Sequence, residues 1–140
     1  MSGIRGSNTK PERTVRSLLH GAGFRFRLQA RHLPGRPDLV LPKHRAVVFV
    51  HGCFWHGHNC HLFKIPSTRP EFWTGKIEGN RARDAVVADR LREAGWRRLV
   101  IWECAMKGKR RLLPEDLQDR ASRWLRGTDE EGEIAGDEIR

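Results

Sequence analysis

The feature that most constrains the fold of this 140-residue chain is an apolar run that ends in a cluster of cysteines and histidines. Residues 46–50 (AVVFV) are all apolar and mostly β-branched, which is typical of a central strand buried on both faces. Residues 51–61 (HGCFWHGHNCH) then hold two cysteines and four histidines. Such a density of ligand side chains beside a core strand indicates a metal site, a reactive site, or both.

The spacing within the cluster favours zinc. Cys53, His58 and Cys60 form a Cys-x4-His-x-Cys motif, and structural zinc is held by four thiolate or imidazole ligands in a tetrahedron. Cys104, the third cysteine of the chain, is the expected fourth ligand, because it ends a predicted strand that would lie beside residues 46–50. We therefore expect a Cys3His site and a zinc-stapled loop.

Alternatives to this ligand set stay open. Cys104 can also be an ordinary buried thiol, and His56 and His61 are rival ligands on spacing alone. A disulfide framework is not expected, because the number of cysteines is odd and no export signal is visible.

Hydrophobic periodicity predicts an α/β protein with a mixed central sheet flanked by helices. Thr9 and Glu12 form a capping-box sequence that starts the first helix, and Gly21 marks its end. The other expected elements are helices at about 76–94 and 114–125, and strands at 24–30, 38–41, 46–50 and 98–103.

The charge of the chain is basic and unevenly distributed. The net charge is +10, but residues 127–140 carry six acidic side chains and one arginine, so the rest of the chain carries +15. A domain this basic predicts a polyanionic partner, nucleic acid above all. We expect one folded domain over residues 1–126 and an acidic, disordered tail over 127–140. With no membrane span and no signal peptide visible, we expect a cytoplasmic protein.

A second metal site is expected near Asp38. A carboxylate is unusual at the start of a strand, so Asp38 either caps a turn or binds a cation. The neighbouring strand ends at Val50, whose backbone carbonyl could join Asp38 around one Mg²⁺, since this ion prefers oxygen ligands. His51 and His56, which the zinc motif leaves unused, are candidate general bases. Asp84, on the next helix, could orient one of them.

Phe54 and Trp55 lie between the predicted zinc ligands. Two large apolar side chains are difficult to bury in a small loop, which favours exposed wedges that insert between DNA bases. Packing against the metal site is the alternative.

Four segments of the sequence resemble the very-short-patch repair (Vsr) DNA mismatch endonucleases, which are nickases with a restriction-endonuclease-like fold. The resemblance runs from about Ile4 to Trp124, and HGCFWHxHxC with a later WEC is its most specific part. It implies an enzyme that nicks double-stranded DNA 5′ of the thymine in a T·G mismatch left by deamination of 5-methylcytosine. The segments are NTKPE, LPGRPDLVLP, AVVFVHGCFWHGHNCHLFKIPSTRPEFWTGKIEGNRARD and GWRRLVIWECA.

The resemblance also implies which residues hold the metals. Asp38 matches the catalytic aspartate that binds Mg²⁺, with the main-chain oxygen of Val50 beside it. Glu12 matches a glutamate bound to metal waters, a role that competes with its place in the capping box. The residues that match the zinc ligands are Cys53, His58, Cys60 and Cys104.

For the reaction itself, His56 matches the histidine of the catalytic centre. His51 and Asp84 match a histidine–aspartate pair, and Phe54 and Trp55 match aromatics that intercalate beside the mismatch.

Phosphate contacts are expected from basic residues near the predicted site, namely Arg5, Lys10 and Arg36. Family members often have a longer basic segment before Ile4 that clamps the minor groove, so a smaller minor-groove contact is expected here. We expect a monomer, with possible mismatch-repair helper proteins as partners. The rival interpretations are a zinc-stabilised DNA-binding module without nuclease activity and a hydrolase with catalytic zinc.

Overall fold

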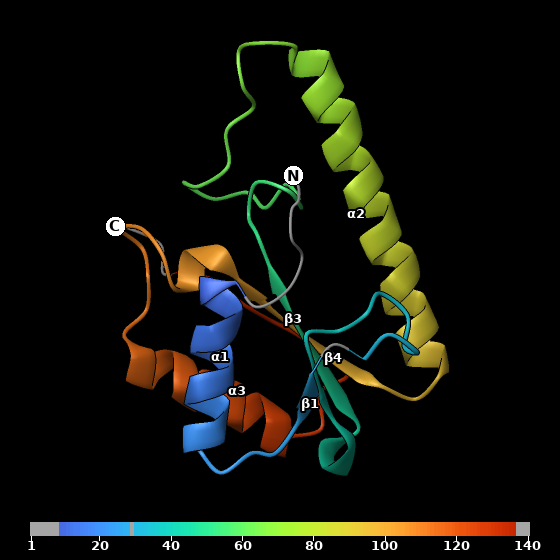
Figure 1. Ribbon diagram of the computed structural model, residues 1–140, viewed down its shortest axis with the longest axis vertical. Coiled ribbons are helices and arrows are strands. Elements are labelled where there is room, and N and C mark those ends of the chain that lie inside the picture. The colour runs from blue at the N-terminus through green and yellow to red at the C-terminus, as the bar shows by residue number, and fades with distance from the viewer. Residues whose placement is uncertain (1–8, 29, 137–140) are drawn as a thin grey trace.

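The computed structural model describes residues 9–28 and 30–136, which form a mixed five-stranded sheet (Figure 1). The strands, in the order in which they lie side by side, are β1 Arg27–Leu28, β2 Leu39–Leu41, β3 Ala46–His51, β4 Arg97–Trp102 and β5 Glu131–Ile134. The pairs β1–β2 and β2–β3 are antiparallel, whereas β3–β4 and β4–β5 are parallel. The predicted α/β class with a mixed sheet is therefore confirmed.

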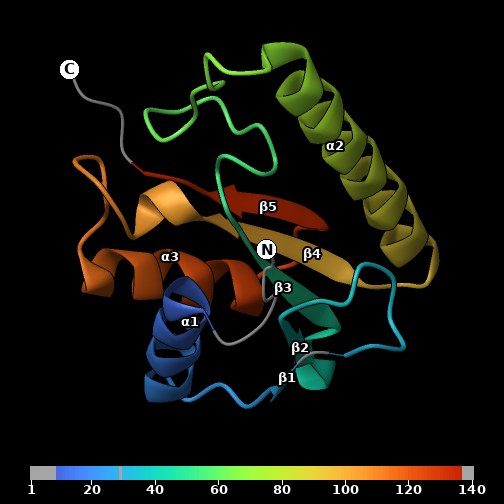
Figure 2. The same cartoon turned by 45° about the horizontal axis from the view of Figure 1, so that its top comes forward.

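Helices cover both faces of this sheet (Figure 2). The alternation of side chains along β3 explains why this run is apolar throughout: Val47 and Val48 point to opposite faces, and both are fully buried. Val48 packs with Leu19 and Leu125 on one face, and Val47 packs with Leu91 on the other. The helices are α1 Lys10–Gly21 and α3 Pro114–Arg126 on the first face, and α2 Pro70–Glu93 on the second.

α1 begins with the capping box that the sequence predicts. Thr9 Oγ1 accepts a hydrogen bond from Glu12 N at 3.4 Å, and the Glu12 carboxylate accepts one from Thr9 N at 3.2 Å. Pro11 lies in the first turn, where a missing N–H costs little. Glu12 is only 3% exposed, so the same cap brings a carboxylate into the interior of the molecule.

Two elements, β1 and α2, differ from the prediction by more than one residue at a boundary. β1 covers residues 27–28 instead of 24–30, because its partner β2 has only three residues with which to pair. α2 begins at Pro70, six residues before the predicted start at residue 76, with proline again in the first turn. Among the described residues, no helix is long and apolar enough to cross a membrane.

The acidic C-terminal stretch, residues 127–140, departs further from the prediction than these boundaries do. Residues 131–134 were expected to be disordered, but they form β5, an edge strand parallel to β4. The physical reason is pairing with the basic sequence of β4: Arg98 Nη1 lies 2.5 Å from Glu131 Oε1, and Ile134 is 6% exposed in the core. The sheet therefore extends past the expected domain boundary at residue 126. Residues 137–140 of the expected tail lie outside the described residues.

Candidate active site and metal centre

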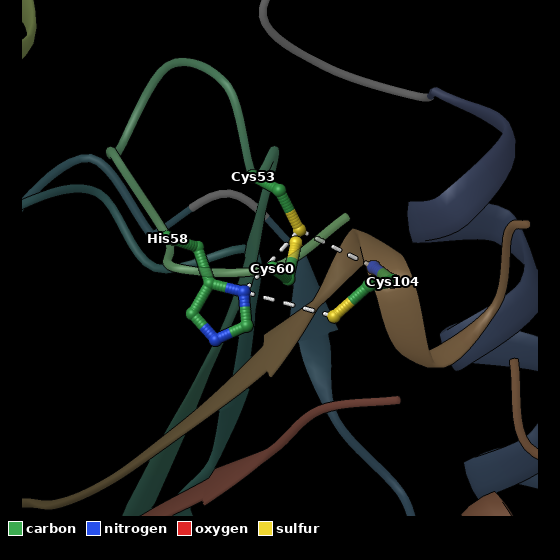
Figure 3. Close-up of side chains that lie close together, drawn as sticks. All are labelled: Cys53, His58, Cys60 and Cys104. Atoms are coloured by element: carbon green, nitrogen blue, oxygen red, sulfur yellow. Dashed lines mark hydrogen bonds between the residues drawn. The ribbon is translucent and has the colours of Figure 1, made fainter. Parts of the chain in front are cut away.

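A group of three cysteines and one histidine lies where the loop after β3 meets the turn after β4 (Figure 3). His58 Nδ1 is 3.6 Å from Cys53 Sγ and 3.6 Å from Cys104 Sγ. Together with Cys60, the four ligand atoms all lie within 4.8 Å of one another. The structure therefore brings Cys104 to the loop motif, although 43 residues separate it from the end of that motif at residue 60.

This geometry fits a tetrahedral metal ion. With zinc–sulfur and zinc–nitrogen distances of about 2.3 Å and 2.05 Å, tetrahedral angles place a sulfur about 3.6 Å from a nitrogen. Both Sγ–Nδ1 distances to His58 are 3.6 Å. The three cysteines form no disulfide, so all four side chains are available as ligands.

The thiols at this centre are strongly buried. Cys53 and Cys104 are 0% and 1% exposed, and burial raises the pKa of both thiols above the usual value. A bound cation favours the thiolate form instead, so metal binding here is expected to release protons.

The rival zinc ligands lie elsewhere. His56 Nδ1 is hydrogen-bonded to Asp84. The His61 ring packs against Gly108, where an added Cβ would lie 2.5 Å from His61 Nε2. Neither histidine belongs to the Cys3His group.

A second group of polar side chains surrounds the end of β3. Asp38 directly precedes β2, and its Oδ2 accepts a hydrogen bond of 2.7 Å from Val50 N. The N–H and C=O of a strand residue point to the same neighbouring strand. The carbonyl of Val50 therefore points toward Asp38, beyond the Leu39–Val48 pair where the β2–β3 ladder ends.

Burial and the neighbouring Glu12 carboxyl disfavour the charged form of Asp38. Burial raises the pKa of Asp38 to about 7; the hydrogen bond from Val50 opposes this shift, and the charge of Glu12 and a hydrogen bond with its side chain add to it. Two buried carboxyl groups in contact disfavour double ionisation unless a positive charge lies between them. Arg16, whose Nη2 is 3.8 Å from Glu12 Oε1, compensates part of this charge.

The histidines are paired differently from the expectation. Asp84 Oδ2 is hydrogen-bonded to His56 Nδ1 at 2.6 Å, whereas the family resemblance implies a His51–Asp84 pair; polar atoms of all three side chains lie within 4.8 Å of one another. The reason is the position of His51, which points inward from the end of β3 and is 8% exposed. The His51 ring stacks on the His56 ring at 3.8 Å, with only 2° between the planes.

Burial and neighbouring charges shift the pKa values of His51 and Asp84. Burial and the neighbouring His56 lower the pKa of His51 to about 3, so His51 stays neutral. Burial raises the pKa of Asp84, but the hydrogen bond and charge of His56 outweigh it, and the net shift is downward. An ionised Asp84 can therefore accept the hydrogen bond from His56 Nδ1 and orient its ring.

Two clefts meet at this group. One, of about 470 Å³, is lined by the basic residues Arg31, Arg36 and Arg98. The other, of about 610 Å³, is lined by Glu12, by Lys107 and by the aromatic loop residues Phe54 and Trp55. The residues that both clefts share are Asp38, Val50, His51 and His56.

The predicted wedges differ in exposure. Trp55 is 43% exposed, as an intercalating residue requires. Phe54 is half-buried and packs edge-on against Trp73 at 5.5 Å and near Phe63 at 6.3 Å. Phe54 thus packs against aromatic residues of the loop and of α2, which is not the packing against the metal site given as the alternative; Trp73 and Phe63 were not predicted. The one available signal was a second Phe-Trp pair, at residues 72–73.

The predicted phosphate contacts are only partly described. Arg5 lies outside the described residues, and Lys10 is exposed at the first turn of α1. Arg36 lines the basic cleft with a left-handed backbone (φ 50°). Arg31 and Arg98 lie in the same cleft and were not predicted, because the adjacency of residues 31 and 98 depends on the sheet.

Sequence comparison identifies one protein family and several relatives of this chain. A family model described as DNA mismatch endonuclease Vsr matches residues 1–62. The DNA mismatch endonuclease Vsr of Escherichia coli K12 is 49% identical over 127 residues, which is 91% of this chain and 81% of that protein. The type II nicking enzyme V.XorIIP of Xanthomonas oryzae pv. oryzae is 52% identical over 106 residues, 76% of this chain and 78% of that protein.

Identity at this level extends over most of both chains, so the similarity is not limited to the metal-binding motif. The mixed sheet with its flanking helices agrees with a restriction-endonuclease-like fold. The chain is an endonuclease that belongs to the Vsr family of DNA mismatch endonucleases.

Proposed function

We propose that this endonuclease nicks double-stranded DNA on the 5′ side of the thymine in T·G mismatches, as required to repair deaminated 5-methylcytosine, and that it needs Mg²⁺. The observation that carries the proposal is the position of Asp38 and the Val50 backbone where a basic cleft meets an aromatic one. This junction can hold a phosphodiester beside a pair of bases that an aromatic wedge has separated.

The residues at the junction suit a hard cation. The carboxylate of Asp38 and the carbonyl of Val50 would hold Mg²⁺, and Glu12 would accept hydrogen bonds from its waters. Such an ion stabilises negative charge on the phosphate and orients the attacking water. A bound cation would also relieve the repulsion that raises the pKa of Asp38.

His56 is the proposed general base. Its Nδ1 is occupied by Asp84, so Nε2 is the nitrogen left to take a proton from water. His51 is neutral and stacks on the His56 ring, and we assign it the role of fixing the orientation of that ring. Cleavage in this way leaves a 5′-phosphate and a 3′-hydroxyl.

Mismatch selectivity is proposed to come from Trp55 and Phe54. Opening a base step costs least where the pair is already mismatched, so a wedge favours such steps over paired DNA. The exposed Trp55 would enter the duplex, and Phe54, braced by Trp73, would support it.

Zinc is proposed to be structural. The Cys3His group offers four ligands within 4.8 Å of one another, which closes a tetrahedral ion to substrate, whereas catalytic zinc keeps an open position. This argument disfavours the catalytic-zinc alternative.

The test is a nicking assay on three duplexes that differ only in carrying T·G, T·A or C·G at one position. Each is incubated with and without Mg²⁺, using the wild type, Asp38→Asn, and Asp89→Asn as a matched surface control on α2. We expect nicking of the T·G duplex alone, only with Mg²⁺, and only by the wild type and the control. Equal cutting of all three duplexes would reject mismatch specificity, and full activity of Asp38→Asn would reject the metal site. A protein that binds the T·G duplex but never cuts it would be the DNA-binding module instead.

A further inference from the structure

The C-terminal segment, defined here as residues 131–136, lies against the Cys3His group. The backbone N–H of Gly136 donates a hydrogen bond of 3.3 Å to Cys104 Sγ. Hydrogen bonds from backbone N–H groups to a ligand sulfur stabilise the thiolate, which is the form that binds metal.

The fit at Gly136 is too close for a side chain. A Cβ added there would lie 2.5 Å from the carbonyl oxygen of Cys104 and 2.7 Å from that of Arg110. Because both contacts are with backbone atoms, they cannot be relieved by a rotamer change. The segment is therefore held against the turn that carries Cys104.

A second contact reaches His58 through Trp102. The Trp102 ring stacks on the His58 imidazole, with centroids 4.1 Å apart and 8° between the planes. Trp102 Nε1 donates a hydrogen bond of 2.6 Å to Glu133 Oε1, which fixes the rotation of the indole. Glu133 and His58 also line the same small cavity. Glu133 can thus orient His58 without being a ligand.

The segment is anchored independently of the metal group. β5 pairs with β4 from residue 131 to residue 134, and Ile134 is 6% exposed in the core shared with α1 and α3. The ion pair between Arg98 and Glu131 fastens its first residue. The contacts from Glu133 to Trp102 and from Gly136 to Cys104 therefore come from a fixed strand and from the two residues that follow it.

We propose that this acidic C-terminal segment is a positioning element of the metal centre: Gly136 orients Cys104, and Glu133, through Trp102, orients His58, so that both ligands are held for zinc. The inference rests on the proposed assignment of zinc to the Cys3His group. It also gives a function to the stretch that composition predicts to be a tail.

The experiment measures zinc affinity of the full chain by competition with a chromogenic chelator, and zinc release after addition of excess chelator. The variants are Glu133→Ala, Glu133→Gln and Gly136→Ala. Glu130→Ala is the matched control, since Glu130 is exposed and contacts Arg98 through its backbone carbonyl. Co²⁺-loaded protein gives a second readout through its thiolate charge-transfer bands. None of these measurements depends on nicking.

We expect Glu133→Ala and Gly136→Ala to bind zinc about 10–100-fold more weakly and to release it faster, as found for other groups that orient metal ligands. Glu133→Gln keeps an oxygen acceptor for Trp102 and should lose less affinity than Glu133→Ala. Glu133 lies at the sheet edge, so its variants are expected to fold even where Gly136→Ala does not.

The outcomes separate the two proposals. Zinc affinity within about twofold of the wild type in the folded Glu133 variants would overturn this inference. A wild type that binds no zinc would overturn it together with the zinc assignment. If the wild type cuts the T·G duplex and the matched duplexes equally while the zinc results are as expected, only the proposed function is overturned.

Discussion

His56 Nδ1 donates a hydrogen bond of 2.6 Å to the carboxylate Oδ2 of Asp84, which joins the loop after β3 to the middle of α2. The bond spans 28 residues of sequence and leaves His51 as a stacked neighbour rather than the partner of the carboxylate.

Asp84→Asn is expected to lower the nicking rate on T·G DNA by about 10²–10⁴-fold, because an amide neither stabilises the imidazolium nor selects the correct tautomer. Single-turnover nicking measures the effect, with Asp89→Asn as the control on the same helix. A rate within a few-fold of the wild type for Asp84→Asn would remove His56 from the role of general base.

The buried Asp38 predicts a particular dependence of stability on pH. Its pKa is about 7 in the folded state and about 4 in the unfolded state. The folded protein therefore binds the extra proton, and this contribution to stability is full below about pH 4 and is lost as the pH rises to about 7. Asp38→Asn removes the titration and keeps an oxygen acceptor for Val50 N–H.

Urea unfolding at about pH 5 and about pH 8, without added Mg²⁺, tests this expectation. The wild type should lose more stability than Asp38→Asn over this interval. Added Mg²⁺ should raise the midpoint of the wild type at the higher pH and leave the variant unchanged. Parallel pH profiles for the two proteins would contradict the raised pKa.

The metal centre predicts a contrast between two histidines of one loop. His58→Ala should reduce zinc affinity by more than the roughly 10–100-fold that loss of a supporting contact causes, and it should lower the thermal midpoint. His61→Ala should keep the zinc, because His61 packs against Gly108 outside the ligand group. Zinc content after gel filtration and thermal unfolding are the measurements. Equal zinc loss in both variants would refute the ligand set.

The two aromatic residues of the loop predict separable effects. Trp55→Ala should weaken binding to T·G DNA by about 5–150-fold, which corresponds to about 1–3 kcal/mol of lost stacking, with little change in thermal stability. Phe54→Ala should lower the thermal midpoint as well, because Phe54 is half-buried and packs against both Trp73 and Phe63, whereas Trp55 is exposed. Fluorescence of 2-aminopurine beside the mismatch reports unstacking. If the Trp55→Ala variant unstacks the base beside the mismatch as much as the wild type does, Trp55 is not a wedge.

Arg36 provides a test of the basic cleft. If Arg36 neutralises one phosphate, Arg36→Gln should reduce the slope of log K against log salt by about 0.9 in magnitude, for matched and mismatched DNA alike. Arg123→Gln, an exposed position on α3, should leave the slope unchanged. An unchanged slope for Arg36→Gln would place the DNA backbone elsewhere.

Features that depend on local sequence pattern could be predicted without the structure. The capping box at Thr9, the apolar run of β3 and the Cys-x4-His-x-Cys spacing are each readable within a few residues, because helix caps, strand burial and chelating loops have short-range signatures. The family resemblance extended this to an endonuclease with a mixed sheet, and the similar proteins and the fold confirm that.

Tertiary structure decided everything that depends on which segments become neighbours. The partner of Asp84, the basic cleft lined by Arg31 and Arg98, and the support of Phe54 by Trp73 all join residues far apart in the chain. The strand β5 is the clearest case: its composition is that of a solvated tail, yet pairing with β4 and an ion pair with Arg98 order it beside the metal centre. Composition averages over a segment, whereas strand pairing depends on the specific backbone and side chains that lie opposite it.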